Sequence, residues 1–530
     1  MPPARARCGP RQGPEGFSAR TIRPMSSVEP PAPGSVANVL EDEALVRDVL
    51  DTPRAGPLAL RGSVLRVGGY GGGMLLALIS APLLIRHLGQ IGFGHYITAI
   101  AIVTIAASLT EGGVNAIALR DFASQSGERR NDSMAHLLGI RIALNVLGVL
   151  GSVAFALIAG YSSALVLGTA VAGIGVMTQS TQSLVSIPLQ GSMRFGWVAG
   201  ADLLRQAVST TLIVTLVLLG AQLVGLLAVS IPASLSALVL TVALARGTMP
   251  LKPAFELRHW LPMLRETFPF AIAIALNSVY FRMTVVVVSL TASELQAGYF
   301  STSFRVVEIL IFIPALVVGA AYPIVARAER DDPERFRHAT QRMFELAVIG
   351  GIWIALGLEL GAGFIVEVLG GAAAEPAAAV LRIQGLAVMG TFVAVACTFP
   401  LLSLRRHREL LLANALGLVV TLALSLSLVP MLEARGGAIA TLGAELVLAS
   451  VVTLMLTRAR HDLRLPLSAV PVALAAGLAG VVAGHLSGVQ PLLEVLIGSV
   501  VYAGGLKLVG RFPPEVSHAL LAHRTAGGDA

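Results

Sequence analysis

Residues 62–123 decide the fold, and they read GSVLRVGGYGGGMLLALISAPLLIRHLGQIGFGHYITAIAIVTIAASLTEGGVNAIALRDFA. An apolar, glycine-rich run from about Val64 to Ile85 is long enough to cross a bilayer as a helix, which takes roughly 20 residues. A polar turn follows it, and a second apolar run extends from about Tyr96 to Thr110. The stretch therefore predicts a membrane hairpin, because water-soluble folds do not place two such segments back to back.

The composition of the whole chain supports a membrane protein. Of the 530 residues, 55% are apolar and only 13% are charged, and the mean hydropathy is +0.78. Ordinary globular domains carry about 25% charged residues. In lipid, backbone N–H and C=O groups must pair within the segment, and continuously apolar runs exclude a membrane β-barrel. The expected class is an all-α polytopic membrane protein.

Apolar segments recur along the chain almost without pause. With the opening pair they predict about 14 transmembrane helices, the others at about residues 135–159, 163–186, 198–219, 222–245, 267–290, 297–322, 343–366, 379–403, 410–429, 436–457, 467–486 and 490–509. No break between them exceeds about 20 residues, which is too short for a soluble catalytic domain. We therefore expect that the chain is not an enzyme.

The basic residues of the loops predict the orientation of the chain. Lys and Arg concentrate in alternate breaks, near residues 120–130, 194, 246–265, 327–342, 405–408 and 458–464. The other breaks hold only Arg86 and Arg435. Because Lys and Arg accumulate in cytoplasmic loops, both termini are expected in the cytoplasm, and a bacterial inner membrane is the expected location.

A weak internal repeat predicts two similar halves. After the longest basic linker, the segment 267–310 again shows an apolar span, a short turn with Gly-Tyr and another span. Repeated halves are common in secondary transporters, with the substrate site between them. The predicted organisation begins with a disordered cytoplasmic tail at residues 1–61, a six-helix lobe at 62–247 and a cytoplasmic linker at 248–266. A second six-helix lobe at 267–457, two extra helices at 458–510 and a cytoplasmic tail at 511–530 follow.

Charged residues inside the predicted spans are the candidate functional residues, since a charge in the membrane is costly unless it is paired or hydrated. Arg305 and Glu308 are three residues apart on one predicted helix and can pair. Arg282 lies at a similar depth on the preceding span, so we expect a cluster of Arg282, Glu308 and Arg305 facing a hydrated cavity. Arginine suits phosphate because its planar fork donates to two oxygens, and the cluster therefore favours an anionic substrate.

Further candidates lie in the first half. Arg141, Asp202 and Arg205 fall within the cytoplasmic third of their spans and are candidate substrate contacts, although arginines there can also reach the lipid headgroups. Glu111 and Asn115 close the second span and, with Glu359, are candidate gate or coupling residues.

Weaker candidates are single polar residues within the spans. Glu445 and Glu494 are single carboxylates of the same kind as Glu359. Glutamine and asparagine side chains could contact sugar hydroxyls, but hydrogen bonding between helices is the commoner use; they are Gln179, Gln182, Asn277 and Gln384. We find no metal, phosphate-loop, dinucleotide or Ser-His-Asp signature, and we expect no cofactor, no metal and no nucleic-acid partner.

The opening block resembles the N-terminal signature of bacterial polysaccharide flippases of the O-antigen type. That signature has a proline in the first span, a turn of the form RxLG-xxx-[FY]G, a second span, and an acidic-x-G close before an arginine. The matching residues are Pro82, Arg86, Leu88, Gly89, Phe93, Gly94, Glu111, Gly113 and Arg120. The block from Phe268 to Arg327 also resembles the family, and the resemblance covers about residues 60–400.

The resemblance implies a two-lobed transporter of the multidrug/oligosaccharidyl-lipid/polysaccharide exporter superfamily. It implies that undecaprenyl-diphosphate-linked oligosaccharide moves from the inner to the outer leaflet by alternating access, for polysaccharide such as lipopolysaccharide O-antigen. The implied partners are the polyprenyl-diphosphate-linked sugar, membrane lipid, an H⁺ or Na⁺ gradient and polysaccharide polymerase proteins. One departure leaves the coupling open. The family often has an acidic residue in the seventh span after an Arg-aliphatic pair, where this chain has Arg282-Met283-Thr284, so Glu308 must substitute or the cavity is more cationic.

Four alternatives remain beside this interpretation. A multidrug cation exporter of the same superfamily would use acidic residues in the first lobe, and the first span has none. A peptidoglycan lipid-precursor flippase shares the span count and the charge pattern. A membrane glycosyltransferase or polymerase would need a large outside loop, and the predicted outside breaks are short. A structural scaffold would leave the buried arginines unexplained.

Overall fold

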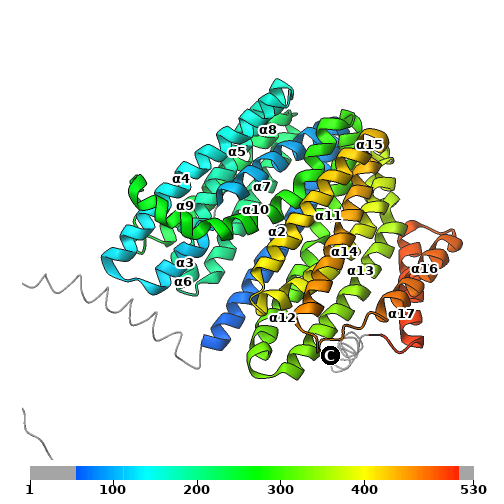
Figure 1. Cartoon of the computed structure of the whole chain (residues 1–530). Helices are drawn as coiled ribbons and strands as arrows, with labels where there is room; N and C mark the ends of the chain where they lie inside the picture. Colours follow the sequence, from blue (N-terminus) through cyan, green and yellow to red (C-terminus); the bar gives the residue numbers. More distant parts are fainter. Residues whose placement is uncertain (1–54, 112, 513–530) are drawn as a thin grey trace, which may run out of the picture. The chain divides into compact units, whose positions relative to one another are not determined.

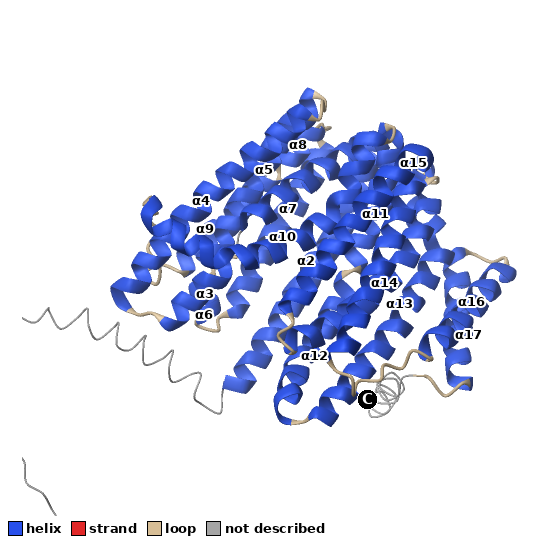
Figure 2. Cartoon of the chain, viewed as in Figure 1, coloured by secondary structure: helices blue, strands red, loops and turns tan. Residues whose placement is uncertain are grey.

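The computed structural model describes residues 55–111 and 113–512 of the chain. Within these ranges the chain forms helices and loops and no strand (Figure 2). The predicted tails at 1–61 and 511–530 lie outside the described residues except for 55–61, which begin the first helix, and 511–512. By its contacts the chain divides into two units, Met1–Pro57 and Leu58–Ala530, and every helix beyond the first turn of the opening one belongs to the second unit.

The helices follow the apolar runs of the sequence. Their bounds are α2 Ala55–Glu111, α3 Val114–Ser124, α4 Gly127–Ile158, α5 Ser163–Val185, α6 Ile187–Gly191, α7 Phe195–Leu218, α8 Leu223–Ala228, α9 Ser230–Leu244, α10 Leu257–Thr291, α11 Glu294–Leu310, α12 Phe312–Asp331, α13 Pro333–Gly370, α14 Ala377–Ser403, α15 His407–Ala459, α16 Ala469–Ser487 and α17 Pro491–Leu508, with a short 3₁₀ turn at Ala372–Ala374 (Figure 1).

Eleven of the described helical segments are long and apolar enough to cross a membrane. Two of them join a pair of predicted spans across a kink, at Gly89 in α2 and at Glu433 in α15. The apolar segment Ala275–Thr291 of α10 corresponds to the remaining predicted span. With the kinked pairs separated, these segments lie at the positions of the predicted spans.

Proline explains where single predicted spans divide into two helices. Pro232 and Pro314 lie just inside α9 and α12, each near the start of the second helix of a divided span, and Pro188 lies just inside α6, which extends beyond the predicted span at 163–186. Because proline has no N–H and its ring crowds the preceding turn, the regular helix is interrupted just before it.

The helices form two groups by their contacts. The first group contains α4, α5, α7, α8 and α9, and the second contains α10, α11, α13, α14 and α15, with α16 and α17 packed on α13. Apolar side chains of α2 lie in a core cluster shared with both groups: Ile85 and Phe93 of α2 are packed with Ile213 of α7 and Phe300 of α11. The opening hairpin thus joins the two groups.

The turn of this hairpin is anchored on both sides. Gly89 has a φ of 67°, in the left-handed region that glycine adopts at little cost. Beside it, Arg86 donates to the carbonyl of Val368 at the end of α13 (2.8 Å), and His87 lies 2.8 Å from the carbonyl of Ala221 after α7. The arginine and the glycine of the RxLG turn therefore each have a structural role.

Just after the turn, two helices touch through glycine. A Cβ on Gly94 would lie 3.0 Å from the backbone nitrogen of Gly298 in α11, closer than a side chain allows without a shift. Nearby, the hydroxyl of Thr302 in α11 donates to Oε1 of the buried Gln90 (2.8 Å). Small residues allow such close helix packing in membranes. This contact places α11, which carries Arg305 and Glu308, against the hairpin.

The outer surface of the helices is apolar. Ile158, Leu218 and Leu508 are among the large side chains that are more than three-quarters exposed. In water such a surface would drive aggregation. The chain is therefore a multi-pass membrane protein whose apolar surface contacts lipid.

Candidate functional site

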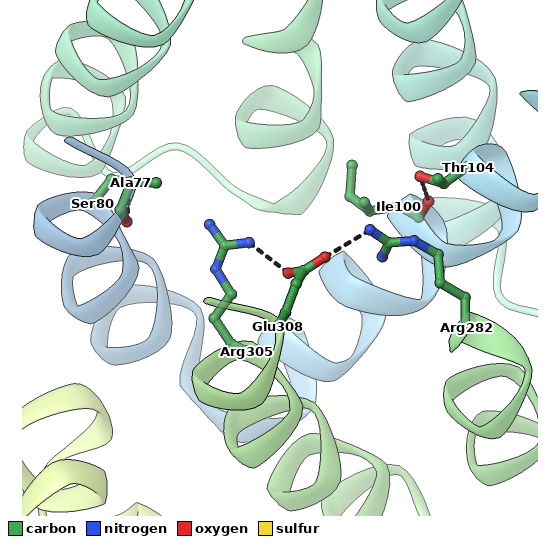
Figure 3. Close-up of polar contacts among 7 residues, drawn as sticks. All are labelled: Ala77, Ser80, Ile100, Thr104, Arg282, Arg305 and Glu308. Carbon is green, nitrogen blue, oxygen red and sulfur yellow. Dashed lines mark hydrogen bonds and ion pairs between the residues drawn. The ribbon is translucent and has the colours of Figure 1, made fainter. Parts of the chain in front are cut away.

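One carboxylate binds two guanidinium groups between α10 and α11. Arg282 Nη2 of α10 donates to Glu308 Oε1 at 2.6 Å, and Arg305 Nη1 donates to Glu308 Oε2 at 2.7 Å. Figure 3 shows the two arginines on opposite sides of the glutamate. The structure thus brings together the three residues that the spacing predicted to meet.

The cluster carries a net positive charge. Two guanidinium groups share one carboxylate, and the Glu308 side chain is only 13% exposed. Charge-assisted hydrogen bonds of this length are the strong ones in proteins. Because both carboxylate oxygens are taken, the further N–H groups of the arginines can bind another anion. Glu308 thus holds the two cations together without neutralising both.

Arg305 and Glu308 face a large cavity. Its volume is about 560 Å³, and its walls come from α2, α5, α6, α7, α11 and α12. Cavities of about 300–1,000 Å³ are the usual size for small-molecule sites. The cavity lies between the first and second groups of helices, since α7 contributes Asp202 and Arg205 and α11 contributes Arg305 and Glu308.

Arg205 reaches this cavity without an ionic partner in the described part of the chain. Its Nε is buried and donates to no acceptor among the described residues, and no described carboxylate pairs with it. An unpaired buried donor is costly to the fold. A ligand oxygen that accepts from this group would remove that cost. Asp202, one helical turn earlier on α7, is exposed and lines the same cavity.

A row of polar side chains forms another wall of the cavity. They lie on one face of α5 and continue into α6, at positions that recur every three or four residues: Gln179, Gln182, Ser183, Ser186 and Gln190. On α7, Gln206 follows Asp202 and Arg205 on the same face. Amides and hydroxyls both donate and accept, which suits sugar hydroxyls.

Part of this wall was missing from the sequence-based candidates. Gln179 and Gln182 were candidates for sugar contacts, whereas Gln190 and Gln206 were not considered. The signal was the helical period itself, because residues at i, i+3, i+4, i+7 and i+11 share a face. Applying this period to the polar residues of each span, and to the residues just after it, would have found both.

Arg141 lies behind the wall and does not line the cavity. It is completely buried, and its Nη2 donates to Asn115 Oδ1 at 2.6 Å. Asn115 in turn donates to Glu111 Oε1 and to Ser183 Oγ, both at 3.0 Å. The expected contact between Arg141 and a substrate is therefore not part of this arrangement. Glu111, Asn115 and Arg141 form one network, in which Arg141 is buried and the other two are half-buried, and the hydrogen bond of Asn115 to Ser183 links it to the cavity.

The described contacts of Glu359 do not include the cluster of Arg282, Glu308 and Arg305. Glu359 lies on α13, where Arg382 of α14 donates to its backbone carbonyl at 3.3 Å and approaches its carboxylate at 3.9 Å. Neither described cavity includes it. The structure does not bring Glu359 together with the other candidates.

A second, much smaller polar cavity lies within the second group of helices. Its volume is about 20 Å³, and Glu445 of α15 is its carboxylate. Tyr280 donates to Glu445 Oε1 at 2.7 Å and Thr391 to Oε2 at 2.8 Å. Both amide atoms of Gln384 in its wall lack a partner among the described residues. Such a space holds about one water molecule.

Comparison with known proteins places this architecture in a family. The structure is similar to an inward closed structure of the lipid II flippase MurJ, with a TM-score of 0.70, 13% identity and coverage of 84% of this chain and 99% of MurJ. It is also similar to an inward-facing multidrug resistance MATE family transporter, with a TM-score of 0.60, 12% identity and coverage of 75% and 99%. These likenesses establish the fold.

A third similar structure is a transporter of the MOP superfamily from Pyrococcus furiosus, whose binding pocket is described as reversed in polarity. Its TM-score is 0.55 at 16% identity, with coverage of 79% of this chain and 97% of that one. No curated protein matches the sequence. Residues 59–329, just over half of the chain, match the family described as polysaccharide biosynthesis protein. The chain belongs to this polysaccharide biosynthesis protein family.

Proposed function

We propose that this protein is a flippase for lipid-linked oligosaccharide. It moves an undecaprenyl-diphosphate-linked oligosaccharide from the cytoplasmic to the periplasmic or outer leaflet, for polysaccharide biosynthesis such as that of O-antigen. The single observation that carries the proposal is the cavity, in which Arg205 and Arg305 come from different helix groups and polar amides line a third wall. Family membership agrees with this substrate class.

The charges of the cavity support an anionic headgroup. Arg205, Arg305, Asp202 and Glu308 line the cavity, and Arg282 binds Glu308 from beside it, so that three arginines accompany two described carboxylates. A diphosphate offers several oxygens to the planar guanidinium forks. The glutamine face then contacts the sugar, and the polyprenyl tail remains in lipid between the helix groups. The proposal is one of transport, with no bond formed or broken.

Alternating access is supported by the positions of the arginines. Arg205 is on α7 of the first group and Arg305 on α11 of the second, so a change in the packing of the two groups changes the distance between them. We take the two helix groups as the predicted lobes, with both termini in the cytoplasm of a bacterial inner membrane. A substrate that contacts both arginines favours the packing in which they are close.

A second candidate is a flippase for a peptidoglycan lipid precursor. The observation that favours it is the likeness to MurJ, a lipid II flippase. The headgroup of the peptidoglycan precursor would contact the same arginines. The two candidate substrates would differ in the contacts of their sugars. A multidrug cation exporter is disfavoured because a third arginine, Arg282, binds Glu308 beside a cavity that already holds Arg205 and Arg305.

The test is export in cells that lack the chromosomal copy. Deletion should make lipid-linked oligosaccharide accumulate on the cytoplasmic leaflet, and the wild-type gene should remove it. Arg282→Ala and Arg305→Ala should both fail to restore export while inserting at normal levels, because each removes a cation beside the cavity. Arg382→Ala is the matched control, since that arginine pairs with Glu359 outside the cavity. Normal export by both cavity variants would overturn the proposal.

A further inference from the structure

Two helical turns that carry a histidine and a carboxylate each face one another away from the cavity. On α4, Asp132 and His136 are four residues apart, with 3.6 Å between His136 Nε2 and Asp132 Oδ1. At the start of α10, Glu256 and His259 are three residues apart, with 2.9 Å between His259 Nδ1 and Glu256 Oε2. The two imidazole rings stack, with centroids 4.9 Å apart.

The packing of the backbone sets this arrangement. Ala254 donates its N–H to the carbonyl of Ala135 at 3.0 Å, so the segment before α10 is hydrogen-bonded to α4. A Cβ on Gly139 would clash with the backbone of Ala254, and it would lie 3.0 Å from the ring of Trp260. Trp260 itself is buried in a cluster with Met134 and Leu137 of α4. The four polar side chains therefore meet at a register that apolar contacts fix independently.

His136 is not satisfied by its described neighbours. The residue is 4% exposed, yet its Nδ1 is buried and has no hydrogen-bond partner in the described part of the chain. A buried histidine normally pairs both ring nitrogens, because an unpaired buried polar atom is costly. Ligand atoms of His136, Glu256 and His259, one from each residue, lie within 4.8 Å of one another. The unpaired ring thus belongs to a set of metal-ligating groups.

We propose that His136, Glu256 and His259 bind a divalent transition-metal ion of the zinc class. Zinc takes imidazole nitrogen and carboxylate oxygen at about 2.0–2.2 Å, so tetrahedral ligand atoms lie about 3.3 Å apart. A small contraction of the present set reaches that spacing, and His259 and Glu256 are exposed and can move. Magnesium and calcium fit less well, because they take oxygen ligands.

Asp132 is the positioning residue of this site. A metal-binding histidine usually donates its other ring N–H to a carboxylate, which fixes the orientation of the ring. Asp132 lies beside His136 at a distance suited to that role after a slight shift. Water completes the coordination on the exposed side.

The bound metal would tie the segment before α10 to α4. That segment connects the first group of helices to the second, so the metal would restrain the connection between them. The proposed metal site does not depend on the substrate of the transporter. It can be confirmed or excluded whether or not the chain moves lipid-linked sugar.

The experiment is zinc binding to the purified full chain without a histidine tag, after treatment with a chelator. Zinc is titrated against a competing indicator, and metal content is measured by mass spectrometry. The wild type should bind one zinc per chain. His136→Gln and His259→Gln should each weaken binding at least about tenfold, and Asp132→Asn should weaken it by about 10- to 100-fold. The double variant His338→Gln/His461→Gln is the control, because both histidines are exposed and lie outside the set.

Hydrogen exchange gives a second measurement that does not depend on the affinity assay. Zinc should slow exchange at residues 254–259 in the wild type and the control but not in Glu256→Gln, whose exposed side chain can be changed without loss of the fold. Absence of saturable zinc binding by the wild type would overturn the proposal. Equal binding by wild type and both histidine variants would overturn it as well.

Discussion

Glu308 and Glu445 each accept two short hydrogen bonds inside the second group of helices, yet their surroundings are opposite. Glu308 is bonded to two guanidinium groups and faces a cavity of about 560 Å³. Glu445 is bonded to two neutral hydroxyls, of Tyr280 and Thr391, in a cavity of about 20 Å³. Glutamate therefore has two different roles. Glu308 is the counter-ion of two arginines beside a large cavity, and Glu445 is the acceptor for two neutral hydroxyls in a small one.

The difference shows which site suits which ligand. A lipid-linked headgroup needs the large volume and the unpaired N–H groups of arginine, which only the first site offers. The second site has room for about one water molecule, and so suits a proton or a small cation. The proposed substrate therefore fits the cavity beside Glu308, and a role of Glu445 in coupling to an H⁺ or Na⁺ gradient is a prediction to be tested.

The largest loss of stability is expected for Glu308→Gln. The amide cannot balance Arg282 and Arg305, which are 16% and 28% exposed. Hydrogen bonds to charged groups contribute roughly 1.5–3 kcal/mol each, so we expect a loss of roughly 3 kcal/mol in stability. The measurement is thermal unfolding in detergent, together with export in cells. Wild-type stability in the variant would show that the two arginines do not depend on Glu308.

Glu445→Gln should be milder for stability and specific for coupling. The amide keeps an acceptor for Tyr280 or Thr391, so the loss should be about 1 kcal/mol. It carries neither a titratable proton nor a negative charge, so transport in vesicles should no longer respond to an H⁺ or Na⁺ gradient, while lipid binding remains. If transport by Glu445→Gln still responds to the gradient like the wild type, the proposed difference in role between Glu445 and Glu308 is wrong.

Substitution in the exposed ion pair of Arg460 and Asp462 should have the smallest effect on stability. Arg460 donates to Asp462 at 3.0 and 3.2 Å in the loop before α16, and these hydrogen bonds lower the pKa of Asp462. A lowered pKa means that the pair contributes stability above the unfolded value of about 3.9, and that this contribution is lost as the pH falls through the folded value. Asp462→Asn should cost less than about 1 kcal/mol at pH 7, because exposed ion pairs are weak.

The check for this pair is thermal unfolding of wild type and Asp462→Asn at several pH values. The difference between them should stay constant from pH 7 to about pH 5 and shrink below about pH 4. A difference that grows as the pH falls would have the wrong sign for a carboxyl with a lowered pKa.

Much of the fold could be predicted because lipid leaves few choices. A continuous apolar run must form a helix in the bilayer, so the spans followed from hydropathy alone. The hairpin at residues 62–123 was predicted as two helices, and α2 contains both with the turn at Gly89. The sites where proline divides a span were harder to place, because they depend on how each helix packs.

The candidate site was predictable only where sequence spacing implies contact. Arg305 and Glu308 share a helix face, and Arg282 lies at similar depth on the adjacent span, so their cluster was expected and is observed. Arg141 was expected to be a substrate contact, but its position depends on a hydrogen bond to Asn115 on another helix. Sequence spacing carries no information about that contact.

The group of His136, Glu256 and His259 was not predicted, for the same reason. Asp132 and His136 are separated from Glu256 and His259 by most of the first helix group, and each pair alone resembles an ordinary polar turn. Only the contact between α4 and the segment before α10 brings them together.

The most direct test of the central claim is binding of a polyprenyl diphosphate without sugar to the purified protein. Arg205→Gln and Arg305→Gln should each weaken binding at least about tenfold, because each removes a charged hydrogen bond of about 1.5–3 kcal/mol. Arg382→Gln should bind like the wild type, since Arg382 lies outside the cavity. Unchanged affinity in both cavity variants would contradict the claim that these arginines hold the diphosphate.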